Sequence, residues 1–285
     1  MKNQRTRKKV IVDVFLLLII LLAGGYVFRS QIRGFWERVD RKFEQSQLPA
    51  ATTRQELAVN ASTSGAPTVN APTVNAPTVN APTDTETEPA LSQDSAPLPA
   101  EMNLKVPFTS QAPHANWDLP YQEACEEAAA LMIHYFFTDQ TFTSDSADEE
   151  INSLVDFQNE KYGFYKDTTA EETVRFIKDR WGYENVVVEA ATVDAIKKSI
   201  ADGVPVILPA AGRQLHNPYF SGEGPLYHML VVKGYTKDGQ FITNDPGTKR
   251  GEDFLYDEDV LLNAVHDWNG GNVGEGAKVM IVVQP

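Results

Sequence analysis

Apolar residues recur with a helical period at several places in the second half of the chain. The segment "CEEAAALMIHYFF", which begins at Cys125, predicts a buried helix because one stripe of it is entirely apolar. Amphipathic helices are also predicted over 146–161 and 169–181, the second after the capping signal "DTTAEE". Two more helices are predicted over 192–203 and 257–265.

Short apolar runs predict strands, most of them late in the chain. The runs 228–235 and 240–245 flank "TKDG", a turn sequence of hairpin type, and so predict two antiparallel strands. Three further strands are predicted over 185–189, 204–210 and 278–283. Because helices come first and strands cluster later, the pattern indicates the α+β fold class.

The most hydrophobic segment lies near the N-terminus. Residues 10–28 contain one charge, Asp13, and are close to the roughly 20 residues that span a bilayer as a helix. A cleaved signal peptide is the alternative, but its apolar region is usually only about 7–15 residues long. We therefore expect a transmembrane anchor, preceded by a basic cytoplasmic tail at 1–9. Basic residues are balanced on the two sides of the anchor, but those before it are more closely spaced. We expect a single-pass protein of a bacterial cell membrane, with its body outside the cytoplasm.

The next two segments connect this anchor to the body of the protein. Residues 29–47 have apolar side chains at helical spacing opposite a basic face, which is typical of an amphipathic helix on the lipid surface. A continuation of the anchor helix into solvent is the alternative. "APTVN" occurs three times in succession at 66–80. Because a Pro- and Thr-rich, nearly uncharged tract buries no core, we predict a disordered linker over 48–100. The globular domain then occupies 101–285, which is enough for one core.

The net charge of −14 is unevenly distributed. The first 45 residues hold ten basic and four acidic residues, so the rest of the chain holds 15 basic and 35 acidic ones. An acidic body argues against nucleic acid as a partner, because nucleic-acid-binding proteins need a basic surface. The chain has one cysteine, which excludes an internal disulfide and a zinc finger built on several thiols. The sequence does not indicate the oligomeric state.

The single cysteine, Cys125, lies where a polar loop becomes the first predicted helix. Free cysteine is commonly buried as a small hydrophobic residue. The alternative is catalysis, because the unpaired N–H groups of a helix N-terminus stabilise a thiolate. Glu126 and Glu127 suit a helix N-terminus, but they would raise the pKa of the thiol if they faced it. We therefore expect the helix to turn both carboxylates away from the sulfur.

Cysteine catalysis also needs a base, a group that orients the base, and donors for the oxyanion. His228 begins an apolar strand beside a Gly- and Pro-rich loop, and Asp245 ends the next strand. An antiparallel hairpin would bring these side chains together, so that the carboxylate holds the imidazole. Gln111, in "VPFTSQAP", is the candidate oxyanion donor beside the N–H of Cys125. The four groups together, rather than any one of them, carry the hypothesis.

Aromatic residues near these groups are candidate substrate contacts. Trp117 and Tyr121 either line a substrate groove or pack around the cysteine helix, and Tyr227 is a further candidate. The loop 217–227, which ends in Tyr227, is either a mobile lid over the site or plain surface. The five histidines form no metal-binding motif of the H-E-x-x-H type, and neither a metal nor another cofactor is implied.

Three segments carry a family resemblance: "VPFTSQAPHANWDLPYQEACEEAA", "GPLYHMLVVKGY" and "FITNDPG". Together they resemble the C39-like cysteine peptidases, a branch of the papain-like fold, over nearly the whole globular domain. The resemblance implies a helix carrying the nucleophile Cys125, packed on an antiparallel sheet carrying the base His228. It also implies Asp245 as the orienting residue and Gln111 as the oxyanion donor. Many members have Gly where this chain has Glu126, a difference that bears on substrate preference.

The sequence therefore predicts a membrane-anchored, extracytoplasmic cysteine peptidase. It would hydrolyse peptide or amide bonds of a peptide or protein substrate through an acyl-thioester. Two alternatives use the same fold: a catalytically silent module that binds peptides or cell-wall material, and an acyltransferase that uses an amine in place of water. The sequence determines neither the substrate nor the bond that is cleaved.

Overall fold

The computed structural model describes residues 39, 41–63 and 97–284 of the chain. The chain divides into two units, Met1–Leu48 and Pro49–Pro285. In the first unit, the described residues 41–46 are helical. Every element discussed below belongs to the second unit.

The segments expected in or near a membrane lie mostly outside these ranges. The basic tail at 1–9, the anchor at 10–28 and the "APTVN" repeats are not among the described residues. Within the part of the chain that is described, no helix is both long enough and apolar enough to cross a membrane. The anchor and the location of the protein therefore stay predictions.

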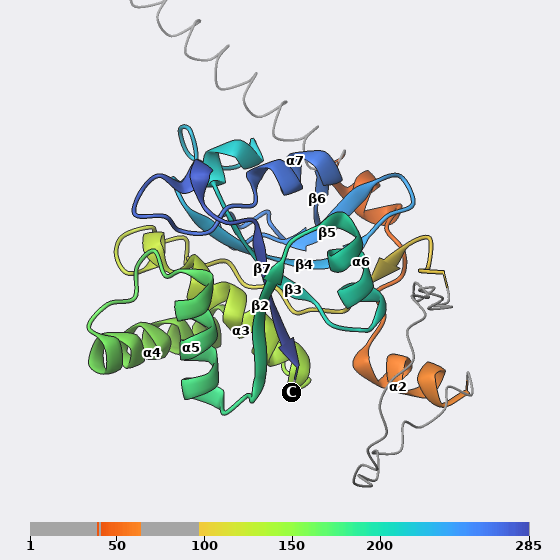
Figure 1. Ribbon diagram of the computed structural model, residues 1–285, viewed down its shortest axis with the longest axis horizontal. Helices are drawn as coiled ribbons and strands as arrows, with labels where there is room; N and C mark the ends of the chain where they lie inside the picture. The colour runs from red at the N-terminus through yellow and green to blue at the C-terminus, as the bar shows by residue number, and fades with distance from the viewer. Residues whose placement is uncertain (1–38, 40, 64–96, 285) are drawn as a thin grey trace, which may run out of the picture. The chain divides into compact units, whose positions relative to one another are not determined.

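The second unit combines helices with one sheet (Figure 1). The α-helices are α2 (Arg54–Thr63), α3 (Cys125–Phe137), α4 (Ser144–Tyr162), α5 (Ala170–Trp181), α6 (Val193–Ala201) and α7 (Glu258–Ala264). The strands are β1 (Met102–Asn103), β2 (Asn185–Ala190), β3 (Val206–Ala210), β4 (His228–Tyr235), β5 (Gln240–Asn244), β6 (Phe254–Asp257) and β7 (Val279–Gln284). Short 3₁₀ helices occupy Tyr121–Glu123, Gly212–Leu215 and Val273–Glu275.

The strands form a seven-stranded sheet in the order β2-β7-β3-β4-β5-β6, with β1 pairing on β4. Each of these pairings is antiparallel. The five helices and five strands predicted within 101–285 are all present, and their bounds differ from the predicted ones by at most two residues. The α+β fold class is therefore confirmed. The prediction omitted β6, which extends the β4–β5 hairpin into a three-stranded meander.

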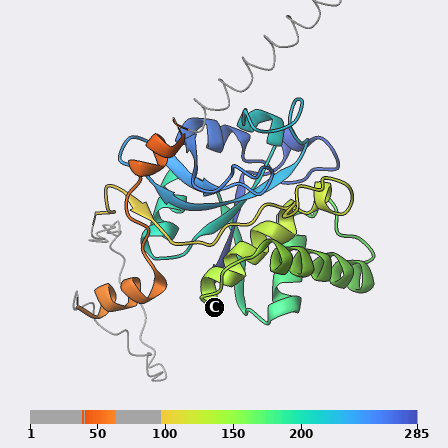
Figure 2. The same cartoon turned by 180° about the vertical axis from the view of Figure 1, so that it is seen from behind.

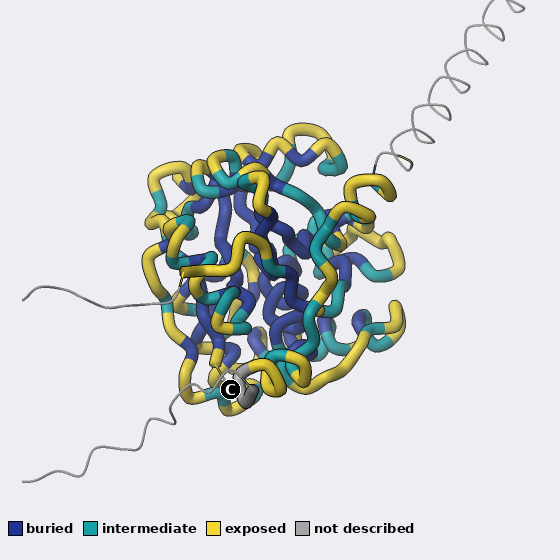
Figure 3. Tube along the Cα trace, turned by 90° about the vertical axis from the view of Figure 1, so that its right-hand side faces the viewer, coloured by how far each residue is buried: buried dark blue, intermediate teal, exposed yellow. Residues whose placement is uncertain are grey.

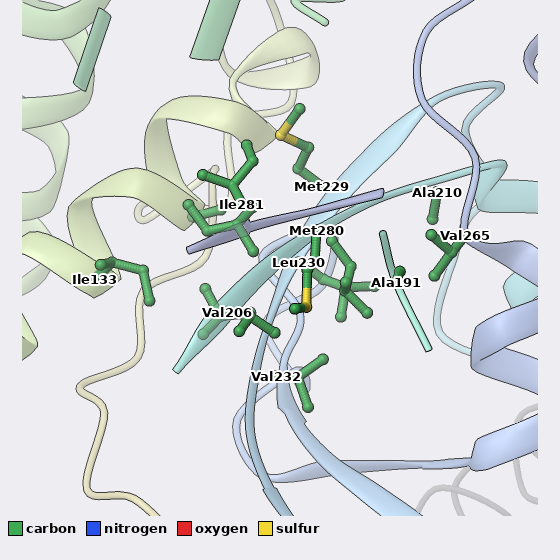
Figure 4. Close-up of a cluster of buried hydrophobic side chains, with 14 of the residues drawn as sticks. Ile133, Ala191, Val206, Ala210, Met229, Leu230, Val232, Val265, Met280 and Ile281 are labelled. Carbon is green, nitrogen blue, oxygen red and sulfur yellow. The ribbon is translucent and has the colours of Figure 1, made fainter. Parts of the chain in front are cut away.

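Buried apolar side chains fill the space between the sheet and its helices. α3 packs on β3 and β4 from one side and α6 packs on the same strands from the other, while α5 covers β2 and β7 (Figures 1 and 2). Every residue of β4 is buried, so neither face of this strand meets solvent. Figure 3 shows the buried positions gathered in the interior, with the exposed positions around them. Figure 4 shows Ile133 of α3 in one cluster with Met229 and Ile281 of the strands.

Two helix starts differ in a way that bears on the site. α5 begins with a capping box, in which Thr169 accepts the N–H of Glu172 and Glu172 accepts the N–H of Thr169. α3 instead follows Ala124, which has no side chain to accept a hydrogen bond from the first turn. The first N–H groups of α3, beginning at Cys125, are thus left without a side-chain cap.

We name residues 49–63 the strap. They were predicted to belong to a disordered linker over 48–100, but they form regular structure. The N–H of Thr52 donates to the carbonyl of Asn103 at 2.8 Å, and its carbonyl accepts the N–H of Lys105 at 2.9 Å. Thr53 and Glu56 then form a capping box that starts α2. The sequence "TRQE" at 53–56 is the signal that the composition argument overlooked.

Side chains of the strap also contact the domain. Leu57 packs against the core and lies against Gly203. The guanidinium of Arg54 donates to the carbonyl of Phe137 and lies 5.2 Å from the centre of its ring. The strap is therefore a part of the folded unit rather than a free tether.

Leu57→Ala should reduce the free energy of unfolding of the full chain by about 1–2 kcal/mol, because a partly buried leucine loses its contacts with the core. Urea denaturation measures this difference, with Gln55→Ala as the control because Gln55 is exposed on the same helix. Equal midpoints for the two variants would show that the strap does not contribute to stability.

Candidate active site

Cys125 stands at the first position of α3, and only 6% of the residue is exposed. Because α3 packs on β4, the sulfur lies beside the start of that strand, where the main-chain N–H of Met229 acts on it. Cys125, His228 and Gln111 all line one cavity of about 610 Å³. The fold thus gathers three of the four predicted groups around a single opening.

The hairpin of β4 and β5 brings His228 and Asp245 together, as the sequence predicted. Val231 pairs with Asn244, so His228 at the start of β4 lies beside the residues that follow β5. Nε2 of His228 lies 2.8 Å from Oδ1 of Asp245. This hydrogen bond leaves Nδ1 as the ring nitrogen that can accept a proton.

The carboxylate of Asp245 is fully buried and accepts three further hydrogen bonds. Oδ1 accepts the N–H of Gly247 at 2.9 Å. Oδ2 accepts the hydroxyl of Tyr256 at 2.6 Å and the side-chain amide of Asn217 at 3.0 Å. Burial alone would raise the pKa of Asp245, but the charge of His228 and these hydrogen bonds together lower it. Asp245 is therefore an ionised group held in one orientation.

Neither Asn217 nor Tyr256 was predicted as a site residue. Tyr256 lies on β6, the strand that the sequence analysis omitted, and its hydroxyl also accepts from the Asn217 amide at 2.8 Å. The aromatic run "FLY" at 254–256, which follows the Gly-rich turn after β5, is the signal that could have revealed this strand. Asn217 sits in an irregular loop, where no local pattern marks it.

A glycine allows the backbone to pass close to the imidazole. A Cβ atom at Gly247 would lie 2.9 Å from Cε1 of His228 and 3.2 Å from Oδ1 of Asp245. Any larger residue would push the ring or the carboxylate out of place. The ring of Phe220, which also lies next to Gly247, meets the imidazole edge to face at 5.4 Å. The ring of His228 is thus held by packing as well as by its hydrogen bond.

The expectation that Glu126 and Glu127 turn away from the sulfur is wrong for Glu126. The thiol of Cys125 lies 3.0 Å from Oε2 of Glu126 and donates to it. Oε1 of the same carboxyl accepts the N–H of Thr168 at 3.1 Å, which fixes its direction. Glu127 points elsewhere, and its Oε1 accepts the side-chain amide of Gln158. Helix periodicity alone could not give this result, because the N–H of Thr168 comes from 42 residues further along the chain.

These buried acids change the proton affinities in the site. Burial raises the pKa of the Cys125 thiol well above its ordinary value, and Glu126 raises it further, whereas the N–H of Met229 acts in the opposite direction. Burial also raises the pKa of Glu126 to about 8. Burial and the neighbouring Glu126 raise the pKa of Glu127 well above its usual range. The thiol form of Cys125 is therefore favoured over the thiolate.

The two glutamates predict a pH-dependent stability. Their folded pKa values are raised, that of Glu126 to about 8, so as pH rises above about 4.3 the folded chain keeps protons that the unfolded chain releases. Stability from these groups is therefore lost as pH rises through that range. We expect the free energy of unfolding to fall by about 2–5 kcal/mol from pH 5 to pH 8.

Urea denaturation at several pH values tests this, with Glu127→Gln as the second protein. Glutamine cannot release a proton, so the decline should be shallower in this variant. An identical decline in both proteins would show that Glu127 does not hold its proton in the folded state.

The structure places the remaining predicted residues as follows. Gln111 donates its side-chain amide to the carbonyl of Tyr121 at 2.8 Å, and its N–H to Pro246, next to Asp245. Trp117 and Tyr227 line the cavity, the first 41% exposed and the second buried. Tyr121 is not among the lining residues, and its hydroxyl contacts Asp148 and Asn152 instead. Tyr121 also packs on an apolar cluster formed by α3 and α4, which agrees with the alternative that it packs around the cysteine helix.

The loop 217–227 forms one wall of the cavity rather than plain surface. Its lining residues are Tyr219, Phe220, Ser221, Gly224, Pro225, Leu226 and Tyr227. Acidic Glu123, Glu126 and Asp167 stand among the other lining residues, together with Lys249. Within the described ranges of the chain, no three His, Cys, Asp or Glu side chains are grouped to hold a metal ion.

Comparison with known proteins gives a family and a related structure. The model of the family described as "Peptidase_C39 like family" matches residues 103–269, a range that contains Gln111, Cys125, His228 and Asp245. No curated protein matches the chain. Eight solved chains match. One is a crystal structure from Bacillus anthracis, provisionally described as a C39-like peptidase, with 15% identity and a TM-score of 0.42. The match covers 65% of this chain and 98% of that one.

Proposed function

Since the chain belongs to the Peptidase_C39 like family, we propose that it is a cysteine peptidase that hydrolyses peptide or amide bonds. The observation that carries the proposal is the cavity shared by Cys125 and His228, with His228 held by Asp245 at 2.8 Å. A sulfur nucleophile, an imidazole and an orienting carboxylate are the three groups that such a reaction requires.

In the proposed reaction, His228 takes the proton of the Cys125 thiol at Nδ1 and the sulfur attacks the substrate carbonyl carbon. The imidazolium then gives its proton to the leaving amine as the C–N bond breaks, which leaves an acyl-thioester on Cys125. A water molecule then gives a proton to His228 and attacks the thioester carbon, the C–S bond breaks, the acid half of the substrate leaves, and the imidazolium returns the proton to sulfur. Asp245 keeps the ring oriented and stabilises its charged form throughout.

The oxyanion would be stabilised by two N–H donors beside the cavity. The N–H of Cys125 belongs to the uncapped first turn of α3. The side-chain amide of Gln111 has two hydrogens, and its bond to Tyr121 uses one of them. The second hydrogen is available to the oxyanion in this proposal.

We also propose that this domain acts outside the cytoplasm on a membrane tether. The support comes from the sequence: the apolar run at 10–28 and the "APTVN" repeats that follow it. Fractionation of cells into membrane and soluble parts would test the attachment to the membrane. Protease treatment of intact cells would test on which side of the membrane the domain lies.

The proposed activity is tested by incubating the full chain with a library of peptides and cell-wall fragments. We expect some members to be cleaved, and one equivalent of iodoacetamide to stop the cleavage, because the chain has a single cysteine. Cleavage that survives complete alkylation of Cys125 would contradict the proposal.

A binding module on the same fold is the second candidate. It is favoured by one observation, which is that the sulfur of Cys125 is engaged in a hydrogen bond with Oε2 of Glu126 at 3.0 Å. If the library contains ligands that bind with no turnover by the parent protein, the binding function is the correct one. Turnover of a bound peptide would exclude it.

A further inference from the structure

The space between the sulfur of Cys125 and the facing carboxyl oxygen of Glu126 has room for only one hydrogen atom. Sγ and Oε2 are 3.0 Å apart, so either the thiol or a protonated carboxyl supplies the hydrogen between them. Oε1 already accepts the N–H of Thr168. A proton added to this carboxyl therefore goes to Oε2, the oxygen that faces the sulfur.

The two arrangements leave the thiol in different states. When Glu126 is ionised, the S–H points to Oε2 and is not available to His228. When Glu126 is protonated, its O–H donates to sulfur, and the S–H is free to turn toward the imidazole on the same cavity wall. The thiolate formed by transfer to His228 then accepts a hydrogen bond from a neutral acid instead of facing a second negative charge.

We propose that Glu126 is a further catalytic residue that controls the nucleophile: its protonated carboxyl supports the thiolate of Cys125, and its carboxylate holds the thiol away from His228. The effect of Glu126 on peptide turnover rests on the proposed peptidase function, whereas its effect on the reactivity of the thiol does not. The proton count is balanced, because Glu126 gains or loses its proton to solvent, whereas the proton of Cys125 goes to His228.

The surroundings of Glu126 place its transition near neutral to mildly alkaline pH. The charged and titratable groups that face it or line the cavity are Cys125, Glu127, Glu123, Tyr165, Lys166, Asp167, Tyr219, Tyr227, His228 and Lys249. Burial first, and then the charge of Asp167, raise the pKa of Glu126 to about 8, whereas the thiol pKa is raised well above 9. The single proton that remains above pH 8 therefore stays on sulfur.

Glu127 provides a matched control. It is the next residue of α3, is equally buried and also has a raised pKa. Its carboxyl contacts Gln158 and is not part of the cavity lining. Glu127→Gln therefore changes a buried glutamate of the same helix and leaves the contact to Cys125 intact.

The test is the rate of alkylation of the full chain by iodoacetamide from pH 6 to 9.5. The chain has one cysteine, so the rate reports Cys125 alone and needs no peptide substrate. We expect the parent rate to fall by about tenfold from pH 7 to pH 9, as Glu126 ionises. An ordinary thiol would instead become about tenfold faster for each pH unit below its pKa, and such a rise would overturn the inference.

Glu126→Gln separates Glu126 from His228 as the cause. The amide is the same shape as the protonated carboxyl, its oxygen accepts the N–H of Thr168, and its NH₂ donates to sulfur at every pH. We expect this variant to react at pH 9 at least as fast as at pH 7, and Glu127→Gln to follow the parent. A tenfold fall that persists in Glu126→Gln would assign the transition to His228 and overturn the inference.

The two proposals fail separately. If Glu126→Gln does not fold, Glu126→Ala, which also removes the carboxylate, takes its place with the same two outcomes, and a rise of the parent rate through pH 9 overturns the inference by itself. If no library peptide is cleaved but the alkylation profiles are as expected, the peptidase function fails and the role of Glu126 toward the thiol stands. If peptides are cleaved and the alkylation rate of the parent rises through pH 9, the peptidase function stands and the role of Glu126 fails.

Discussion

Cys125→Ala is expected to reduce turnover of any cleaved library peptide by at least about 10⁴-fold, because the acyl-thioester can form on no other atom. The chain offers no second thiol as a substitute. The groups that remain, His228 with Asp245 and the N–H donors of the cavity, can only orient a water molecule. Initial rates with parent and variant at equal concentration measure the effect.

The fold should tolerate this substitution, so the loss will report chemistry. Alanine is smaller than cysteine, and it removes a buried sulfur whose hydrogen bond goes to a neighbouring side chain. Far-UV circular dichroism and the urea midpoint of Cys125→Ala serve as the control for folding. A well-folded variant that retains a tenth or more of the parent rate would show that Cys125 is not the nucleophile.

Asp245→Asn is expected to reduce kcat by about 10²–10⁴-fold, as a neutral amide does not stabilise the imidazolium and can turn its NH₂ rather than its oxygen toward Nε2, which favours the wrong tautomer. It is also expected to lower the free energy of unfolding by about 2–4 kcal/mol. The amide can replace only one of the two carboxylate oxygens as an acceptor. Either His228 and Gly247 or Tyr256 and Asn217 then lose a partner inside the protein.

The two effects of Asp245→Asn are separated by measuring kcat at a temperature where the variant is fully folded. Asp238→Asn is the matched control, because Asp238 is exposed in the turn of the same hairpin. We expect it to keep the parent rate and stability. A parent-like kcat for folded Asp245→Asn would remove the orienting role of this carboxylate.

The hairpin shows how far the sequence alone could lead. The turn "TKDG" and the two apolar runs fix antiparallel pairing, and the pairing puts His228 beside the residues after β5. The pairing of histidine with aspartate was therefore predictable from local pattern and one rule of sheet geometry. The position of Cys125 at the start of α3 followed in the same way from the change between a polar loop and an apolar helix.

Other features depend on contacts between distant segments, which no local pattern encodes. Asn217 reaches Asp245 from an irregular loop, and Tyr256 reaches it from β6. The direction of Glu126 is set by the N–H of Thr168, in the segment before α5. The strap is a different case: its capping box was readable at "TRQE", but the composition of the surrounding linker outweighed it.

In the proposed mechanism, a covalent bond forms between the substrate and the sulfur of Cys125. It is measured by mixing the full chain with a cleaved peptide, quenching in acid within the first turnover, and determining the mass of the fragment that contains Cys125. We expect this fragment to gain the mass of the acyl half of the substrate, and to release it after treatment with hydroxylamine. Cleavage that continues while Cys125 stays unmodified would contradict the proposed mechanism, provided that an ester analogue of the peptide also leaves no adduct on Cys125.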